Sequence, residues 1–220
     1  MIKFLAILVY VFFSPMQIKH NHLPFYQLKH DQSEVTYDEA LQLWQRGLYD
    51  EAEQALTKLA NDGHANAQAF LASAYLEGTQ LEKSYEQALH WCNQCALQAH
   101  ESCIYMLGAM YFHGKGLEKD WTKALDYFEL LAEQGHLQAQ VNIGHILLMG
   151  NNPDFQAALQ WIIPAAKEEH AHAQALLGFA YTFGKGVKRN EKKGYRYYRK
   201  AANNGSDWAQ KILEMDGLSW

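Results

Sequence analysis

The feature that most constrains the fold of this chain is an internal repeat. Alignment on His64, His100, His136, His170 and Ser206 gives spacings of 36, 36, 34 and 36 residues. The first halves of the four units read HANAQAFLASAYLEG, HESCIYMLGAMYFHG, HLQAQVNIGHILLMG and HAHAQALLGFAYTFG. A period in this range is typical of solenoid proteins, in which each unit buries its apolar face against its neighbours.

The pattern within each unit predicts two helices. In the first half of unit one, Ala67, Leu71 and Tyr75 recur at steps of four, the spacing of one helix face. A glycine follows each first half, and we expect it to end the helix in the left-handed conformation: Gly78, Gly114, Gly150 and Gly184. The second halves, such as TKALDYFELLAEQG, predict a second helix. Unit three has a turn two residues shorter, which reads NNPD.

These patterns predict an all-α, right-handed α/α solenoid of stacked helical hairpins. The expected repeats are residues 64–99, 100–135, 136–169 and 170–205. We expect a helix pair at residues 37–63 to precede them and a capping helix at residues 206–220 to follow.

The N-terminal residues differ from the repeats. One Lys precedes a ten-residue apolar run from Phe4 to Phe13, which is too short to cross a bilayer and resembles a secretory signal. We therefore expect residues 1–18 to be a signal peptide or a weak anchor, and residues 19–36 to be a linker. A buried helix of the fold is the alternative. The signal predicts a periplasmic or secreted protein, and an integral membrane protein only if the N-terminus stays as an anchor.

Composition and motifs exclude several classes of function. Hydrophobic residues make up 49% of the chain and charged residues 20%, as in ordinary globular proteins. The net charge of −5 argues against nucleic-acid binding, which needs a basic face. The sequence contains no S-x-x-K or H-E-x-x-H motif, and its carboxylates are spread over the predicted helix surfaces. We therefore expect no enzymatic activity, no cofactor and no metal site.

All three cysteines fall within twelve residues, in CNQCALQAHESC at 92–103. Cys95 lies at the end of a second helix and Cys103 in the first turn of the next helix, so the hairpin geometry brings them within bridging distance. A zinc knuckle made by the three cysteines and His100 is one alternative. A redox pair of Cys92 and Cys95 is another, although the strand-to-helix context of such pairs is missing. The simplest role for Cys92 is that of a small hydrophobe in the core.

The repeat pattern resembles the Sel1-like repeat family, a relative of the tetratricopeptide repeats. The second unit carries the fullest match: Leu107, Gly108, Tyr111, Gly114, Gly116, Asp120, Ala124, Tyr127 and Gly135. The resemblance covers residues 37–220 and departs locally from the family pattern. Ala72 replaces a glycine, Gly194 replaces an alanine, and Glu169 replaces a closing glycine.

The family resemblance implies a pairing for the cysteines. The spacing CALQAHESC resembles the bridge of the cysteine-rich secreted branch, which implies a disulfide between Cys95 and Cys103. In that branch every repeat carries such a bridge, whereas here one junction does. An exported chain would also reach the oxidising compartment that a disulfide needs.

The first helices offer a surface for binding. They line the concave side of stacked hairpins, so the arc opposite Ala67, Leu71 and Tyr75 should face outward. Across the four units this arc holds Phe70, Ser73, Glu77, Met106, Ala109, His113, Asn142, His145, Met149, Leu176, Phe179 and Phe183. Methionine and aromatic residues at such positions favour an adaptable peptide-binding surface. The alternative is that some of them pack against the adjacent repeat.

The last unit is locally basic. From Lys185 to Lys200 there are eight Lys or Arg residues and one Glu, a local charge of +7. The candidate patch consists of Lys188, Arg189, Lys192, Lys193, Arg196, Arg199 and Lys200. These cations form either a solvated convex face or a contact for an acidic partner, an anionic lipid surface or the cell-wall polymer.

The resemblance implies a non-catalytic adaptor of the bacterial envelope that binds a protein or peptide in its concave groove. One alternative is a peptidoglycan or polysaccharide binder, whose groove aromatics would stack on sugars. Another is a β-lactam-binding or β-lactamase-like protein, because the cysteine-rich branch has been linked to that chemistry.

Overall fold

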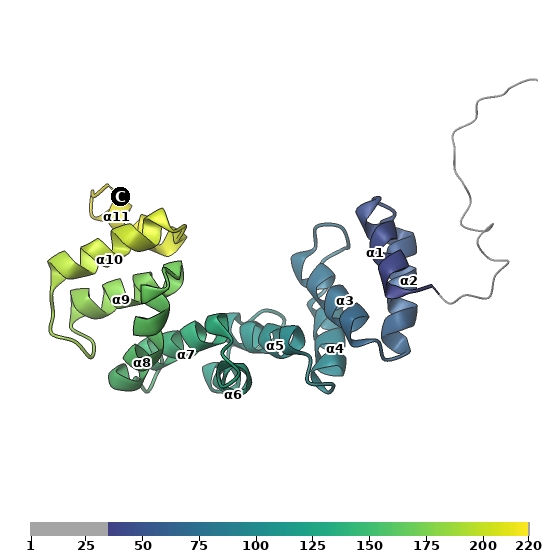
Figure 1. The fold of residues 1–220 in the computed structure, drawn as a ribbon, viewed down its shortest axis with the longest axis horizontal. Coiled ribbons are helices and arrows are strands. Elements are labelled where there is room, and N and C mark those ends of the chain that lie inside the picture. Colours follow the sequence, from purple (N-terminus) through teal and green to yellow (C-terminus); the bar gives the residue numbers. More distant parts are fainter. Residues whose placement is uncertain (1–34, 220) are drawn as a thin grey trace, which may run out of the picture. The chain divides into compact units, whose positions relative to one another are not determined.

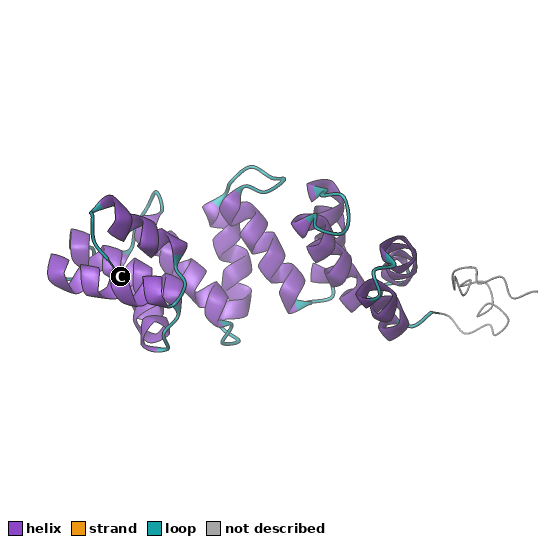
Figure 2. Ribbon diagram, turned by 90° about the horizontal axis from the view of Figure 1, so that it is seen from above, coloured by secondary structure: helices purple, strands orange, loops and turns teal. Residues whose placement is uncertain are grey.

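The computed structural model describes residues 35–219, which contain helices and loops and no strands (Figure 2). In chain order the helices are α1 (Tyr37–Gln45), α2 (Tyr49–Asn61), α3 (Ala65–Glu77), α4 (Tyr85–Ala96), α5 (Glu101–His113), α6 (Trp121–Ala132), α7 (Leu137–Met149), α8 (Phe155–Lys167), α9 (Ala171–Phe183), α10 (Glu191–Asn203) and α11 (Asp207–Met215). The predicted signal or anchor at residues 1–18 lies outside the described residues, as does nearly all of the predicted linker.

Packing follows the order of the chain. Each helix from α1 to α11 contacts the helix before it and the helix after it, as can be followed along the colours of Figure 1. In addition, α3 contacts α5 and α7 contacts α9, so first helices of successive units touch. The predicted all-α arrangement of stacked helical hairpins is confirmed.

Histidines begin most of the first helices. The Nδ1 atoms of His64, His136 and His170 accept hydrogen bonds from the backbone N–H three residues on, at 3.2, 3.2 and 3.3 Å. Each imidazole thereby satisfies one of the N–H groups that a helix start leaves unpaired. The second helices are capped by shorter polar side chains: Ser84, Asp120, Asp154 and Asn190.

Three of the four glycines that follow the first helices adopt the expected left-handed conformation. They are Gly78, Gly114 and Gly184, with φ of 66°, 71° and 69°. The prediction is wrong for Gly150, which is extended with φ of −72°. The short NNPD turn explains the difference: the N–H of Asp154 reaches back to the carbonyl of Leu147 at 2.9 Å, two residues sooner than in the other units.

Small residues let the two helices of a hairpin approach closely. In three units a Cβ added to the first-helix glycine would lie within 2.8 Å of a second-helix side chain: Gly108 against Phe128, Gly144 against Ile162, and Gly178 against Tyr198. Unit one has Ala72 and Cys92 at these two positions, and both are fully buried. The smaller cysteine leaves room for the alanine methyl group, which explains why Ala72 can replace a glycine here.

Candidate functional site

Ring-bearing side chains form a continuous row across units two to four. We call this row the ring cluster, and it consists of Phe112, His113, Trp121, His145, His172, Phe179, Phe183 and Trp208. Most of these residues come from the first helices α5, α7 and α9, while Trp121 begins α6 and Trp208 lies on α11.

One end of the ring cluster is built around Phe112. Its ring stacks on Trp121 with centroids 5.5 Å apart and meets the His145 ring edge to face at 5.0 Å. The Trp121 ring also lies 5.7 Å from His145. The ammonium group of Lys119 sits over the Trp121 ring at 4.3 Å, within the range of a cation–π interaction. A cation therefore borders the aromatic surface here.

The row continues through two histidines to α11. The Nδ1 atom of His145 and the Nε2 atom of His172 are 2.8 Å apart, so the two imidazoles share a hydrogen bond. The His172 ring is 6.0 Å from Trp208, which in turn lies 6.4 Å from Phe179. Phe179 contacts Phe183 at 4.7 Å. Aromatic pairs at these distances attract each other and hold the surface in one arrangement.

Burial keeps the two histidines uncharged at neutral pH. Desolvation, followed by repulsion from His172, Lys119 and His113, lowers the pKa of His145 to about 3. Desolvation, followed by repulsion from His170 and His113, lowers the pKa of His172 to about 4. Near pH 7 the centre of the ring cluster is therefore neutral and largely apolar.

Exposed apolar side chains lie at the edge of the ring cluster. Phe183 is 57% exposed at the end of α9, and Met149 is 37% exposed at the end of α7. Met149 and Trp121 line the same shallow hollow, together with Lys119 and Asn151. Each of these exposed side chains adjoins a ring of the cluster, and contiguous apolar patches mark contact surfaces more reliably than scattered residues do.

In the structure, some of the predicted groove residues of units two to four lie in or beside the ring cluster, and others are buried. His113, His145, Phe179 and Phe183 lie in the ring cluster, and Met149 borders it. The prediction of an outward-facing position is wrong for two others. Leu176 is fully buried in the core, because its helix is covered on that side as well.

Asn142 is the other buried position. It is 7% exposed, and its side-chain amide donates a hydrogen bond to the hydroxyl of Tyr105 on the preceding first helix, at 3.3 Å. The contact between successive first helices thus uses this part of the predicted groove.

The remaining predicted groove residues do not join the ring cluster. In unit one the ring of Phe70 is met edge to face by Trp44 of α1, at 4.9 Å. Ser73 donates a hydrogen bond to Glu77 at 3.1 Å. Met106 and Ala109 of unit two are half-buried. The aromatic surface therefore belongs to the C-terminal part of the repeats.

Sequence reasoning missed Phe112, Trp121, His172 and Trp208. The last two occupy the same register, two residues after the start of their units at His170 and Ser206. In the folded chain, side chains at this register contact the preceding first helix: His172 meets His145, and Trp208 meets His172. A search for rings at this register, in addition to the outward arc, would have found His172 and Trp208.

The cysteines are paired as expected. Cys95 and Cys103 form a disulfide that links α4 to α5, with Cα atoms 6.0 Å apart. This bond uses two of the four ligands that a zinc knuckle would need, and one thiol of the alternative redox pair. Cys92 is unpaired and fully buried, and burial raises the pKa of its thiol to about 12. Its role as a core residue is confirmed.

The Sel1 repeat family matches residues 65–100, 102–136, 137–170 and 171–206, more than half of the chain. The chain belongs to the Sel1 repeat family.

Two solved structures share the fold of this Sel1 repeat protein. A Sel1 repeat protein from Oxalobacter formigenes is 29% identical, with a TM-score of 0.66 over 81% of this chain and 74% of that chain. A protective antigen with an SLR fold, c5321 from uropathogenic Escherichia coli, is 30% identical, with a TM-score of 0.60 over 76% of this chain and 37% of that chain.

A curated relative is the chitin synthase regulator SKT5 of Saccharomyces cerevisiae. It is 37% identical over 75 residues, which make up 32% of this chain and 11% of the regulator. The Sel1 repeat protein thus spans a small part of that relative's length.

The predicted basic patch of this Sel1 repeat protein is partly used in internal contacts. Arg189 pairs with Glu191, Lys193 donates to the Tyr181 hydroxyl at 2.6 Å, and Arg199 donates to the backbone carbonyl of Ser219 at 3.0 Å. The exposed remainder comprises Lys188, Lys192, Arg196 and Lys200. The last three follow one another at steps of four along α10, so they share one face.

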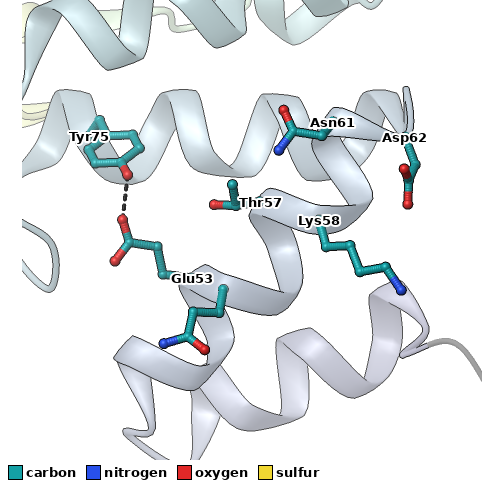
Figure 3. Close-up of a pocket in the computed structure, with 7 residues that line it drawn as sticks. Glu53, Thr57, Lys58, Asn61, Asp62 and Tyr75 are labelled. Atoms are coloured by element: carbon teal, nitrogen blue, oxygen red, sulfur yellow. Dashed lines mark hydrogen bonds between the residues drawn. The ribbon is translucent and has the colours of Figure 1, made fainter.

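A polar hollow lies beside α2 and α3 of the Sel1 repeat protein (Figure 3). The Tyr75 hydroxyl donates a hydrogen bond to Glu53 there, and the rest is lined by Gln54, Thr57, Lys58, Asn61 and Asp62. Between residues 35 and 219, no group of three or more His, Cys, Asp or Glu side chains is placed to hold a metal. In the same part of the chain, no helix has the length and apolar character of a membrane span.

Proposed function

We propose that this Sel1 repeat protein is a non-catalytic adaptor that binds a segment of a protein partner on its ring cluster. Membership of the family supports the general part of this proposal, because Sel1 repeats mediate protein–protein interactions. The choice of surface rests on the ring cluster itself.

The single observation that carries the proposal is the continuity of the ring cluster. Its rings connect α5, α6, α7, α9 and α11, and it ends at Phe183, which is 57% exposed. Phe, Trp and Met are enriched in the cores of protein interfaces, where they supply large contact areas. Several rings already fixed by packing would lose little conformational entropy when a partner binds.

We further propose that the adaptor acts in the bacterial envelope or outside the cell. The disulfide between Cys95 and Cys103 supports this location, because disulfides persist in oxidising compartments. The lysine and the apolar run from Phe4 to Phe13 support it independently, as a sequence that resembles an export signal.

Site-specific photo-crosslinking tests the proposed surface. A benzophenone amino acid would replace Phe183 on the ring cluster or, as a matched control, Leu130 on the second helix α6. Both side chains are 57% exposed, so the two probes meet solvent to the same extent. Irradiation in cells should produce a defined protein adduct from position 183 and none from position 130. Adducts that are equal at both positions, or absent from both, would contradict the proposal.

A further inference from the structure

We propose that the outer face of α10 is a second binding surface, and that it binds an acidic helix of a protein partner whose carboxylates recur at steps of four residues. This surface lies on a second helix, whereas most of the ring cluster comes from first helices. The inference therefore goes beyond the proposed function and does not rest on it.

Three positions, spaced four residues apart, face solvent in every second helix. Their side chains are exposed in all five of these described helices: Asp50, Gln54 and Lys58 of α2; Glu86, His90 and Gln94 of α4; Thr122, Asp126 and Leu130 of α6; Gln156, Gln160 and Pro164 of α8; and Lys192, Arg196 and Lys200 of α10. The first four sets mix acidic, neutral and apolar residues and hold one lysine between them. Among these helices, α10 alone presents three cations, and we call them the cation row.

The cation row is not neutralised within the protein. In the described part of the chain, no ion pair involves Lys192 or Lys200, and Arg196 makes only a ring contact with the adjacent tyrosine, at 6.0 Å. The flanking cations Lys193 and Arg199 instead donate hydrogen bonds within the fold. Like charges four residues apart on a helix repel each other, so the row costs stability in the free protein. A row of carboxylates placed opposite would remove this repulsion.

The spacing of the cation row matches that of another helix. Residues four apart on a helix rise by about 6 Å, so the three cations form a line about 12 Å long. A partner helix with Glu or Asp at steps of four presents its carboxylates with the same rise, so three ion pairs can form at once. Each exposed ion pair contributes little by itself. The simultaneous match of all three is therefore what distinguishes such a helix from other acidic segments.

The borders of the cation row disfavour a flat anionic surface such as a membrane. Acidic residues lie around the row: Glu191 begins α10, Asp216 accepts from the Tyr195 hydroxyl, and the carbonyl of Glu169 accepts from Asn204 directly after α10. A flat surface over the row would bring its own anions towards these carboxylates. No large apolar side chain of α10 is exposed to insert between lipids. A partner one helix wide can cover the row alone.

Two capped peptides test the inference on the full-length protein, each about 16 residues long so that a helix can form. In an alanine and glutamine background, the first carries three Glu residues at every fourth position. Its isomer carries them at every fifth position, which turns them towards three different faces. By NMR titration at low salt, the first peptide should bind about fivefold more tightly, because it can form two more ion pairs. The largest shifts should lie in α10, and added salt should weaken binding.

The decisive variant is Lys192→Gln with Arg196→Gln and Lys200→Gln. It should lose the preference between the two peptides, and its thermal stability should not fall, since repelling charges are removed. The matched control removes the same number of charges from exposed cations elsewhere in the described chain: Arg46→Gln, Lys83→Gln and Lys167→Gln. The control should keep the preference for the first peptide.

Sedimentation with vesicles of phosphatidylglycerol and phosphatidylcholine tests the membrane as the alternative occupant. Vesicle binding that requires the cation row, with no binding of either peptide, would overturn the inference. Equal affinities for the two peptides, or a preference that survives in the decisive variant, would also overturn it. The proposed function fails separately, through the absence of an adduct at position 183, and that failure would leave the result for α10 intact.

Discussion

The junction between units one and two is held differently from the junctions around it. Elsewhere, a glutamine four residues after the helix cap donates to a backbone carbonyl of the preceding helix, at 2.8–3.3 Å: Gln68 to Ala60, Gln140 to Ala132, Gln174 to Ala166 and Gln210 to Ala202. Between α4 and α5 the same register holds Ile104, and the disulfide of Cys95 and Cys103 links the helices instead.

This junction also lacks the side-chain helix cap that its neighbours have. His100 makes no side-chain cap, and its Nδ1 atom is buried without a partner. Ala99 takes the left-handed conformation, with φ of 57°, where Gly63 and Gly135 stand at the corresponding positions. A covalent bond thus stands where the other junctions have a glutamine hydrogen bond, while the bonds of Gln98 to Gln68 at 2.9 Å and of His100 to Asn66 at 3.0 Å are kept. The repeat thus specifies how the helices pack, whereas each junction can use its own chemistry.

Acid should have the largest effect on stability. It should act on the histidine pair between α7 and α9, away from the junction of units one and two. In the folded state the pKa values of His145 and His172 lie at about 3 and about 4, below the ordinary value of about 6.5 in an unfolded chain. Between pH 6.5 and these lower pKa values, the unfolded chain binds more protons than the folded chain does. The free energy of unfolding therefore decreases as the pH falls below 6.5. We expect a loss of about 3 kcal/mol between pH 7 and pH 5.

Urea denaturation across this pH range measures the loss. The double variant His145→Phe and His172→Phe should flatten the pH dependence, whereas His90→Phe should leave it unchanged. An equal slope in the wild type and the double variant would show that the acid sensitivity originates elsewhere.

Removal of the disulfide should have the next largest effect. The variant Cys95→Ala with Cys103→Ala releases a nine-residue loop, which in the chain-entropy model costs about 2.5 kcal/mol of unfolding free energy. Hydrogen exchange should rise first at α4 and α5. A reducing agent should reproduce the loss in the wild type and have no effect on the variant. A change below about 0.5 kcal/mol would mean that the junction does not depend on its bond.

A glutamine junction should be less costly to break. Gln174 is buried, donates to the carbonyl of Ala166 and accepts from the side chain of Asn204 at 2.9 Å. Gln174→Leu removes the donor to the Ala166 carbonyl and one of the two acceptors of the Asn204 amide, which keeps its bond to the Glu169 carbonyl at 3.1 Å. We expect the variant to reduce the unfolding free energy by about 1–2 kcal/mol. Gln94→Leu, at an exposed position of α4, serves as the control. If Gln174→Leu were neutral, these bonds would not hold the units together.

The smallest effect should be a gain. Ala99 and Glu169 have φ of 57° and 63°, values that favour glycine. We expect Ala99→Gly and Glu169→Gly each to stabilise the protein by about 0.5–1 kcal/mol. Gly63→Ala, at the corresponding position with φ of 91°, should have the opposite sign. Thermal denaturation compares the three variants, and a loss for either glycine substitution would contradict the strain assigned to these residues.

The fold was predictable because its signals are local and repeated. The four-residue steps around Leu71, a histidine before each first helix and a glycine after it recur in every unit, so the signals of one unit support those of the others. The conformation of Gly150 was predicted wrongly because it depends on the hydrogen bond from the N–H of Asp154, the cap of the next helix, to the carbonyl of Leu147. A contact between residues on either side of a loop leaves little trace in a repeat pattern.

The candidate site was predictable only in part, for a related reason. The outward arc of a single helix included Phe179 and Phe183, which lie in the ring cluster. It could not show that Leu176 would be buried, or that His172 would reach His145 on another helix. These facts depend on how successive first helices approach one another, which the spacing within one unit does not record.

Two pairs of exposed apolar side chains allow the most direct test of the central claim that partner binding resides on the ring cluster. Met149→Ser with Phe183→Ser changes its edge, and Leu97→Ser with Leu130→Ser changes two exposed leucines, one directly after α4 and one in α6. The measurement is the amount of the partner crosslinked through position 183 that each immobilised variant retains. The first pair should lose at least about tenfold in affinity, as expected for hot-spot side chains, with unchanged thermal unfolding. Loss of the partner by the leucine pair, with full retention by the first, would contradict the account.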